Sequence, residues 1–353
     1  VIPRGKIYDG RARNKSKKKD KTKMKKILIL GSNSFAGATF IKYISGKDHL
    51  KIFAISRSKE NDYYRLPYKW ISKGNFVTFK KFDINKNYNE IIKYLNKIKP
   101  NYIVDFAAQG MVNQSWQNPE HWYYTNVYSK AKLHNYLCKS GYIEKYLKIS
   151  TAEVYGNSST KIIERAHYNP STPYALSHAT MDMNLKLLHD NFKFPVVFAR
   201  PLNFYGPGQQ IFRIIPKTIY AILKKKKLFL EGDGSAIRSF VYSDDFSDAM
   251  YKSLIKGRKG EIYHIASDEY ISIKSLVNKI CIKLSTNFND IVVSVPARIN
   301  QDQNYFLNTQ KIKKKLKWFP KVSLTKGLDN TISWLSRNIN KVRNSDLIYI
   351  HKK

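Results

Sequence analysis

The stretch MKKILILGSNSFAG, residues 24–37, decides the fold that the sequence predicts. Residues 27–30 form a continuous apolar run, which is typical of a strand in a parallel sheet that is buried on both faces. Gly31, Ser34 and Gly37 follow and lead into a helical pattern that runs to about Ser45. Such a turn lets backbone amides meet a pyrophosphate. A plain strand–turn–helix is the alternative, because Ser34 stands where such motifs have their middle glycine.

Outward from this stretch, apolar strands and longer helical patterns alternate up to residue 200. The expected strands are 52–56, 76–82, 102–106, 145–150 and 196–200, and the expected helices are 88–98, 119–140 and 174–191. This alternation predicts an α/β fold with a doubly wound parallel sheet of the Rossmann type and right-handed crossovers.

The chain after Pro201 has shorter strands and more turns, so we expect a second unit there. Residues 24–200 would form a dinucleotide-binding Rossmann domain, and 228–266 would return to it. Residues 201–227 and 267–342 would form a smaller C-terminal substrate-binding lobe. We expect this lobe over the carboxyl edge of the sheet, where open α/β sheets bind ligands.

The net charge of the chain is strongly positive. Its 353 residues include 63 Lys and Arg against 26 Asp and Glu, a formal charge of +37. Such an excess can indicate nucleic-acid binding, but lysine is spread over the whole chain beside abundant Ile, Asn and Tyr, as in proteins from AT-rich genomes. We therefore do not favour nucleic acid as a partner. A positive field that attracts anionic substrates such as nucleotides is the milder expectation.

Residues 1–23 are rich in Lys and Arg and have no hydrophobic periodicity, so they predict a disordered tail. An arm that touches RNA or a membrane is the alternative. No apolar run approaches the ~20 residues of a membrane span, and no apolar segment follows the basic N-terminus as in a signal peptide. Cys138 and Cys281 form neither a disulfide framework nor a metal-ligand spacing. The expectation is a cytoplasmic protein without a metal site.

Three more strand ends carry residues that suit a dinucleotide. The second strand ends in Ser56 and Arg57; an acidic residue there would bind the ribose 2′-hydroxyl of NAD, whereas an arginine suits the 2′-phosphate of NADP. Asp83 follows the third strand, where it could reach the adenine amino group, and the small segment 107–109 (Ala-Ala-Gln) leaves room after the fourth. NADP is the favoured cofactor and NAD the alternative.

Seven motifs together resemble one known family. They are GSNSFAG (31–37), FDI (82–84), FAAQ (106–109), STAEVYG (150–156), ARPLNFYGPGQ (199–209), EGDGSAIRSFVYSDD (231–245) and INQDQNYFLNTQKIKKKLKWFP (299–320). From about residue 25 to 339 the chain resembles the extended short-chain dehydrogenase/reductase family, among its nucleotide-sugar epimerases and dehydratases. The last three motifs resemble nucleoside-diphosphate-glucose 4,6-dehydratases, whereas FAAQ and the SRS strand end (56–58) resemble NADP-using GDP-mannose 4,6-dehydratases. The resemblance implies these cofactor-binding residues: Gly31, Ser34, Phe35, Gly37, Arg57, Asp83, Ile84, Ala107, Ala108, Gln109, Tyr174 and His178.

The resemblance implies a lyase that acts on a nucleotide-linked hexose. A base takes the proton of the sugar 4-hydroxyl as hydride leaves for the nicotinamide; Tyr174 matches that base, and Thr151 would hydrogen-bond the same oxygen. The 4-ketone acidifies the C5 proton, which Glu153 would remove while the 6-hydroxyl departs as water. Hydride then returns to C6, which gives a 4-keto-6-deoxyhexose. A 4-epimerase, decarboxylase or reductase of the same family is the alternative.

Besides Ser34, two further positions depart from the family pattern. His178 stands where the motif Tyr-x-x-x-Lys has its lysine, one helical turn after Tyr174 and on the same face. The lysine would bind the nicotinamide ribose and lower the pKa of the tyrosine, whereas a histidine with an ordinary pKa of about 6.5 is only partly charged at pH 7. A catalytically impaired nucleotide-sugar-binding protein is therefore a further alternative. Ala152 stands where many glucose dehydratases have an acid, so Glu153 or water would serve both proton transfers.

On the substrate side, the resemblance implies contacts with the sugar and diphosphate from Asn203 and Arg238. Arg298 is a candidate for a second diphosphate contact, because an arginine fork suits phosphate oxygens. The motifs do not specify the nucleotide base or the hexose. Helices 119–140 and 174–191 would pair across a two-fold axis in this family, so we expect a homodimer.

Overall fold

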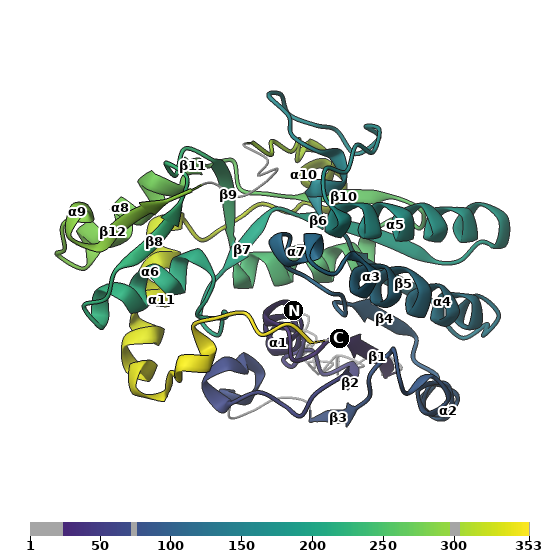
Figure 1. Ribbon diagram of the computed structural model, residues 1–353. Coiled ribbons are helices and arrows are strands. Elements are labelled where there is room, and N and C mark those ends of the chain that lie inside the picture. Colours follow the sequence, from purple (N-terminus) through teal and green to yellow (C-terminus); the bar gives the residue numbers. More distant parts are fainter. Residues whose placement is uncertain (1–23, 72–75, 297–303, 353) are drawn as a thin grey trace, which may run out of the picture.

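The computed structural model describes residues 24–71, 76–296 and 304–352, so the predicted tail, residues 1–23, lies outside the described residues. Its centre is a seven-stranded sheet with the order β10-β6-β5-β4-β1-β2-β3 (Figure 1). The strands are β1 (Lys25–Leu30), β2 (Leu50–Ser56), β3 (Val77–Lys81), β4 (Tyr102–Asp105), β5 (Lys145–Ile149), β6 (Val196–Pro201) and β10 (Ile262–Ile265). All neighbouring strands pair in parallel. The order reverses at β1, which confirms the predicted doubly wound parallel sheet.

Helices cover both faces of this sheet. One layer holds α1 (Phe35–Ile44) and α7 (Ser243–Lys256), and the other holds α2 (Tyr88–Ile98), α4 (Lys130–Cys138) and α5 (Pro173–Phe192). Ile27 and Ile29 of β1 pack in the core of the first layer. Leu28 and Leu30 pack in the core of the second. The apolar run at residues 27–30 is thus continuous because alternate side chains are buried on opposite faces.

The segment predicted as one helix from 119 to 140 has three consecutive parts. It begins with α3 (Pro119–Trp122), continues as the π-helix η4 (Tyr123–Ser129) and ends as α4. Asn126 in the π-helix accepts the amide of Gln109 (2.8 Å) and donates to its carbonyl (3.1 Å). It also donates to the hydroxyl of Ser177 on α5 (3.0 Å). The wide turn therefore fixes the loop after β4 against α5.

A smaller lobe stands beside the large sheet (Figure 1). It contains a three-stranded sheet of β7 (Asn203–Tyr205), β9 (Ile237–Tyr242) and β11 (Tyr270–Ser272), and a pair of β8 (Leu228–Glu231) and β12 (Val292–Val295). Its helices are α6 (Ile214–Leu223), α8 (Ile273–Lys283), α9 (Phe288–Ile291) and α11 (Leu324–Asn338).

Short 3₁₀ helices occur along the whole described chain. They are η1 (Tyr63–Arg65), η2 (Pro67–Lys69), η3 (Asn113–Trp116), η5 (Ala152–Tyr155), η6 (Ile339–Lys341) and η7 (Asn344–Asp346).

The exchange between the two units differs in detail from the expected boundaries. Strands β8 and β9 hydrogen-bond within the small sheets. We expected the chain to return to the Rossmann domain at residue 228, but it returns only with α7 and β10. Helix α10 (Gln310–Leu316), expected in the lobe, buries Ile312 and Leu316 in the core of the large sheet instead. In the part of the chain that the structure describes, no helix is both long and apolar enough to cross a bilayer.

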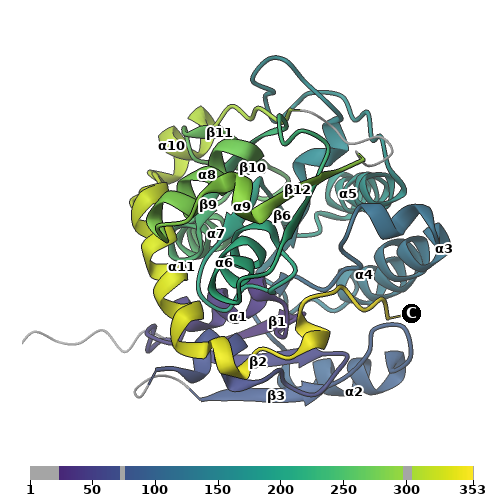
Figure 2. The same ribbon diagram turned by 60° about the vertical axis from the view of Figure 1, so that its left-hand side comes forward.

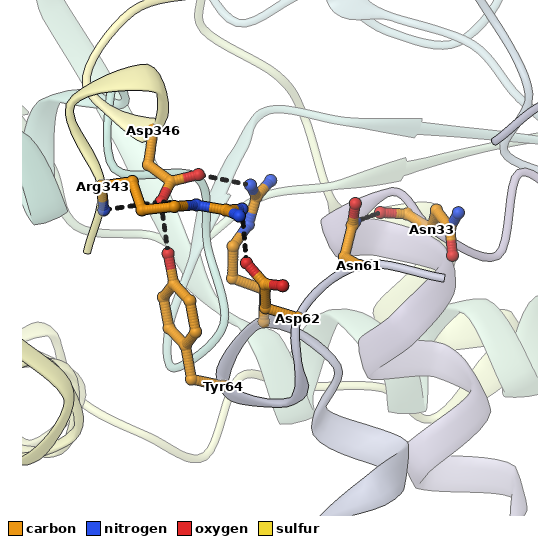
Figure 3. Close-up of polar contacts among 7 residues, drawn as sticks. Asn33, Asn61, Asp62, Tyr64, Arg343 and Asp346 are labelled. Carbon is orange, nitrogen blue, oxygen red and sulfur yellow. Dashed lines mark hydrogen bonds and ion pairs between the residues drawn. The ribbon is translucent and has the colours of Figure 1, made fainter. Parts of the chain in front are cut away.

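The segment 343–352 leads from the smaller lobe back to the carboxyl ends of the large sheet (Figure 2). Figure 3 shows its anchor at Asp346. That carboxylate accepts hydrogen bonds from the hydroxyl of Tyr64 (2.8 Å), from Arg65 (3.3 Å) and from the backbone amide of Arg343 (2.9 Å). The Arg343 guanidinium also pairs with Asp62 at 2.5 Å. The segment is therefore attached to the loop that follows β2.

Candidate active site

The glycine turn lies close against the sheet edge. Gly31 has a φ of 81°, and a Cβ there would lie 2.7 Å from the backbone nitrogen of Ala107. A Cβ on Gly37 would lie 2.5 Å from the carbonyl oxygen of Gly31, so both positions require glycine. Ser34 caps α1, because its hydroxyl accepts from the amide of Gly37 (3.0 Å) and donates to the carbonyl of Gly31 (2.7 Å). The serine that stands for the middle glycine therefore tightens the turn.

A cavity of about 620 Å³ lies at the carboxyl ends of the strands, with residues of both units in its lining. This volume is within the usual range for ligand sites. The predicted site residues in its lining are Ser34, Phe35, Arg57, Ala108, Gln109, Thr151, Glu153, Tyr174, His178, Asn203 and Arg238. Arg298 lies outside the described residues. The structure thus brings together residues from seven separate segments of the chain.

Five predicted cofactor residues do not line this cavity: Gly31, Gly37, Asp83, Ile84 and Ala107. The two glycines and Ala107 act through the shape of the turn. The Asp83 carboxylate accepts the amide of Asn85 at 2.8 Å, and Ile84 packs against the second helical layer. A contact of Asp83 with adenine stays a prediction.

Three predicted catalytic residues meet at one end of the cavity. Tyr174 is in the first turn of α5, and Thr151 and Glu153 are at the start of η5, directly after β5. Burial and the Glu153 charge raise the pKa of Tyr174 above its usual value, whereas a hydrogen bond with Thr151 and the charge of Arg213 lower it. Thr151 and Arg213 are therefore the groups that favour the phenolate over the phenol.

His178 lies beside Tyr174, with ring centroids 4.8 Å apart and the rings edge to face. It is 4% exposed, and neither ring nitrogen has a hydrogen-bond partner among the described residues. Burial, together with the charges of Lys148 and Lys130, lowers the pKa of His178 well below its usual value. The expectation of a partly charged histidine at pH 7 was wrong, because burial and two nearby ammonium groups disfavour the imidazolium.

Arg213 was missed by the sequence reasoning. It immediately precedes α6, lines the cavity and exerts its charge on both Tyr174 and Glu153. Burial lowers the pKa of its guanidinium, but an arginine stays charged. The sequence has no signal for this role, because a single arginine before an apolar helix is common on protein surfaces.

Part of the cavity is occupied by the chain itself. The carbonyl oxygen of Lys352 accepts hydrogen bonds from Arg57 (3.1 Å) and from the amide of Gln109 (2.5 Å). Tyr349 lines the cavity, and His351 stacks on Trp122 with centroids 5.1 Å apart. Two residues that we assigned to the cofactor therefore bind the segment 343–352 in this structure.

A second pocket of about 240 Å³ adjoins the smaller lobe and shares Asn203 and Arg238 with the main cavity. Much of its lining is the segment 229–236, which runs from β8 to the start of β9. Arg238 lies over the ring of Tyr305, with 4.8 Å between its Cζ and the ring centroid. The two predicted substrate residues thus stand where the two spaces join. No group of His, Cys, Asp and Glu suited to a metal ion occurs among the described residues.

Comparisons with known proteins agree with this geometry. A family model described as GDP-mannose 4,6 dehydratase matches residues 28–331. The dTDP-D-glucose 4,6-dehydratase of Mus musculus is 32% identical over 265 residues, which cover 73% of this chain and 74% of that protein. The dTDP-glucose 4,6-dehydratase of Haemophilus influenzae is 28% identical over 339 residues, 88% of this chain and 98% of that protein.

Among solved structures, DesIV, a dTDP-glucose 4,6-dehydratase of Streptomyces venezuelae crystallised with NAD, is similar with a TM-score of 0.82 and 26% identity. The match covers 90% of this chain and 98% of that chain. These similarities confirm the predicted resemblance to nucleotide-sugar dehydratases and epimerases.

Proposed function

The chain belongs to the GDP-mannose 4,6-dehydratase family, and we propose that it is an NAD(P)-dependent nucleotide-sugar 4,6-dehydratase. It would oxidise C4 of a nucleotide-linked hexose, eliminate water across C5 and C6, and return hydride to C6. The observation that carries the proposal is the meeting of Tyr174, Thr151 and Glu153 in one cavity that also extends to Ser34 in the glycine turn.

Three features of the structure fit a nicotinamide dinucleotide. The turn at Gly31 and Gly37 leaves no room for side chains, so a pyrophosphate can approach the backbone at the N-terminus of α1. His178 offers two buried ring nitrogens for a ribose hydroxyl. The bound dinucleotide would take hydride from the sugar and return it. Arg57 at the end of β2 favours NADP, whereas DesIV was crystallised with NAD.

Tyr174 and Glu153 divide the proton transfers. Tyr174 would take the proton of the 4-hydroxyl, assisted by the hydrogen bond with Thr151 and the charge of Arg213. Glu153 would then remove the C5 proton, which the neighbouring ketone has made acidic. Because position 152 is an alanine, Glu153 would also pass a proton to the departing 6-hydroxyl. Glu153 raises the pKa of Tyr174 through its charge, so the two groups are close enough to serve one bound sugar.

The two adjoining spaces support a division of the substrate. The hexose would lie at Tyr174 in the main cavity, and the nucleoside would lie in the second pocket against residues 229–236. Arg238 would bind the diphosphate at the junction, because a guanidinium suits phosphate oxygens.

A homodimer and a cytoplasmic location are further parts of the proposal. Exposed apolar residues gather on η4 and α5, among them Tyr124, Tyr128, Met183 and Leu187. Large exposed apolar patches mark interaction sites, and these two helices are those expected to pair across a two-fold axis. Both cysteines are free, which suits a reducing compartment.

The test is to incubate the purified protein with NAD or NADP and with GDP-, dTDP-, UDP- and CDP-hexoses. We expect one nucleotide donor to lose water, seen by mass spectrometry, and to gain the absorbance of a 4-keto sugar. Glu153→Gln should lower the dehydration rate by roughly 10²–10⁴-fold, the usual effect of removing a general base. The matched control is Glu120→Gln, since Glu120 is an exposed carboxylate outside the cavity.

Other outcomes identify the alternatives. A product of unchanged mass with inverted C4 would indicate a 4-epimerase, and loss of CO₂ from a uronic acid donor would indicate a decarboxylase. Dinucleotide binding without turnover of any donor would contradict the dehydratase and indicate a binding protein.

A further inference from the structure

A buried group of charges lies beneath the catalytic end of the cavity. In the sheet, Asp105 of β4 is the direct neighbour of Lys148 on β5, so both side chains point to the face covered by α4 and α5. The Asp105 carboxylate accepts from the ammonium of Lys130 and from the hydroxyl of Tyr146 (2.7 Å). All four side chains are at most 2% exposed. One carboxylate therefore faces two buried ammonium groups.

Lys148 is the ammonium without a partner. Lys130 is paired with Asp105, but Lys148 has no hydrogen bond or ion pair with any described residue. Lys148 lowers the pKa of Asp105, but Lys130 already pairs with that carboxylate, so the lysine at position 148 adds a surplus buried charge, which is unfavourable for folding. Lys148 also exerts the strongest charge effect on His178.

The geometry of α5 places His178 over the same region. One turn after it, Asp182 accepts from the hydroxyl of Ser150 (2.5 Å), and Ser150 is two residues beyond Lys148 on the same face of the chain. His178 has two buried nitrogens without a partner, and a neutral imidazole needs a donor at one of them. Lys148 is a donor without an acceptor, so a hydrogen bond from Lys148 to one ring nitrogen of His178 would provide a partner for both residues.

We propose that Lys148 is a positioning residue of the dinucleotide site: when the dinucleotide binds, Lys148 would donate to one nitrogen of His178, which has no hydrogen-bond partner among the described residues here, and direct the other nitrogen toward the nicotinamide ribose. The pair would together provide the charge and the hydrogen bond that a single lysine at position 178 provides in the motif Tyr-x-x-x-Lys. The idea rests on the dinucleotide site of the proposed function and does not depend on the identity of the sugar.

The test is a cycle of substitutions that exchanges the two positions. In His178→Lys, a third ammonium would join Lys130 and Lys148 around one carboxylate, so we expect dinucleotide affinity to fall by about tenfold or more and Tm to drop. In the double variant His178→Lys, Lys148→Met, the surplus charge is removed, and affinity and Tm should return close to those of the wild type. Restoring the motif lysine alone should therefore harm the protein.

The single variant Lys148→Met is tested by the pH dependence of dinucleotide affinity, which a change in side-chain packing alone would not alter. The groups that face His178 are Lys148 and Arg200 on the sheet, Lys130 on α4, Asp105 on β4 and Tyr174 on its own helix. We expect dinucleotide affinity to be flat from pH 5 to pH 8 in the wild type. In Lys148→Met, protonation of His178 should make affinity depend on pH nearer to the ordinary value of about 6.5. Lys139→Met, which removes an exposed lysine, is the matched control.

Fluorescence titration with NAD and NADP in the absence of sugar measures these affinities. If Lys148→Met binds like the wild type at every pH, or if His178→Lys alone tightens binding, the proposal is wrong. Should Lys148→Met fail to fold, Lys148→Gln takes its place for the pH test alone: it removes the charge and keeps a donor, so its affinity should become pH-dependent, and a flat profile would overturn the proposal. Normal dinucleotide binding without a 4-keto product would contradict the proposed dehydratase and leave the role of Lys148 intact.

A different observation concerns the segment 343–352. Its anchor is the buried carboxylate of Asp346, held by Tyr64 and Arg65 from the loop after β2 (Figure 3). The same loop holds the glycine turn, because Asn61 donates to the carbonyl of Asn33 (2.8 Å). From this anchor the segment extends to Arg57 and Gln109, which both bind the carbonyl of Lys352. Arg57 and Gln109 are two of the predicted dinucleotide-binding residues.

We infer that residues 349–352 compete with the adenosine half of the dinucleotide and must leave before it binds. The groups that would bind the cofactor, the Arg57 guanidinium and the Gln109 amide, are already used by the Lys352 carbonyl. The ring of His351 is held by Trp122 and by a hydrogen bond to His121 (2.8 Å). The anchor at Asp346 would stay in place, so the segment could close again after release.

Removal of residues 349–353 tests this competition. We expect the dissociation constant for NAD or NADP to fall by roughly threefold to tenfold, with faster association in stopped-flow fluorescence, because competing hydrogen bonds are lost. Lys352→Ala is the matched control: the contact uses a backbone carbonyl, so this variant should bind like the wild type. Unchanged or weaker binding after truncation would overturn the inference, and weaker binding would show that the segment covers the cofactor.

Discussion

Two carboxylates are buried beneath the cavity, and their charges are neutralised in different ways. Asp182 on α5 pairs with Arg200 on β6 at 2.8 Å, and both side chains are fully buried. Two tyrosine rings, Tyr155 and Tyr168, lie 4.7 Å from the Arg200 guanidinium. Asp105 shares a region with two lysines, only one of which it pairs. The first site is balanced in charge, whereas the second has a surplus positive charge that acts on His178.

This difference shows what each site does. The paired charges of Asp182 and Arg200 fix α5 on β6. A surplus ammonium is unfavourable for folding, but together with burial, which has the larger effect, it lowers the pKa of His178. The pKa values agree with this view: the charges of Lys130 and Lys148 outweigh burial and lower the pKa of Asp105 to about 2.

The largest expected effect comes from breaking the balanced pair. Arg200→Met should lower the free energy of unfolding by about 3–5 kcal/mol, because it leaves the Asp182 carboxylate buried without its partner. Denaturant unfolding measures this loss. The double variant Asp182→Asn, Arg200→Met should recover most of it, and a loss below ~1 kcal/mol in the single variant would contradict the balanced pair.

Removing one of the two lysines beside Asp105 should lower the free energy of unfolding by less. Lys130→Met should lower the free energy of unfolding by only about 1 kcal/mol, because Lys148 remains beside Asp105 to neutralise it. Lys130→Met combined with Lys148→Met should cost about 3–5 kcal/mol, since Asp105 is then unpaired. Additive small losses in the same unfolding experiment would show that Asp105 does not need either lysine.

Raising the pH should increase the free energy of unfolding, because Lys130 loses its proton in the folded protein first. Burial lowers the pKa of Lys130 to about 8, since the opposing charge of Asp105 offsets burial and Lys148 only in part. The folded protein then loses this proton at lower pH than the unfolded chain, so stability rises between pH 8 and 10. The gain should be on the order of 2 kcal/mol. In Lys148→Met one repelling charge is gone, and the gain should shrink; an equal rise in both proteins would contradict the coupling.

The smallest expected change in the free energy of unfolding comes from an exposed ion pair, and the buried pairs can be compared with it. Lys186 and Asp190 form an exposed pair one turn apart on α5. Lys186→Ala should change the free energy of unfolding by at most ~0.5 kcal/mol, as is usual for surface pairs. A loss comparable to that of Arg200→Met would mean that charge pairs on α5 act through the helix itself and not through burial.

Most of the fold could be predicted, because the apolar periods of strands and helices are local in sequence. The main misjudgements concern β8, β9 and α10, short elements whose partners lie elsewhere in the chain. The motif STAEVYG and the helix that begins at Tyr174 led us to expect Thr151, Glu153 and Tyr174 at one site, and all three line one cavity; their catalytic roles stay a prediction. Arg213 and the segment 343–352 could not be placed, because a lone arginine and a short segment of mixed polar and apolar residues carry no period.

The sequence by itself determined the doubly wound sheet, the glycine turn and the residue types at the catalytic end of the cavity. These depend on alternation within a strand, on one helical turn and on short motif spacings. Only the tertiary structure decided that burial lowers the pKa of His178, that Lys148 and Lys130 share one carboxylate, and that the Lys352 carbonyl reaches Arg57. Charge states and long-range contacts depend on burial and on neighbours far apart in the chain, which local patterns do not encode.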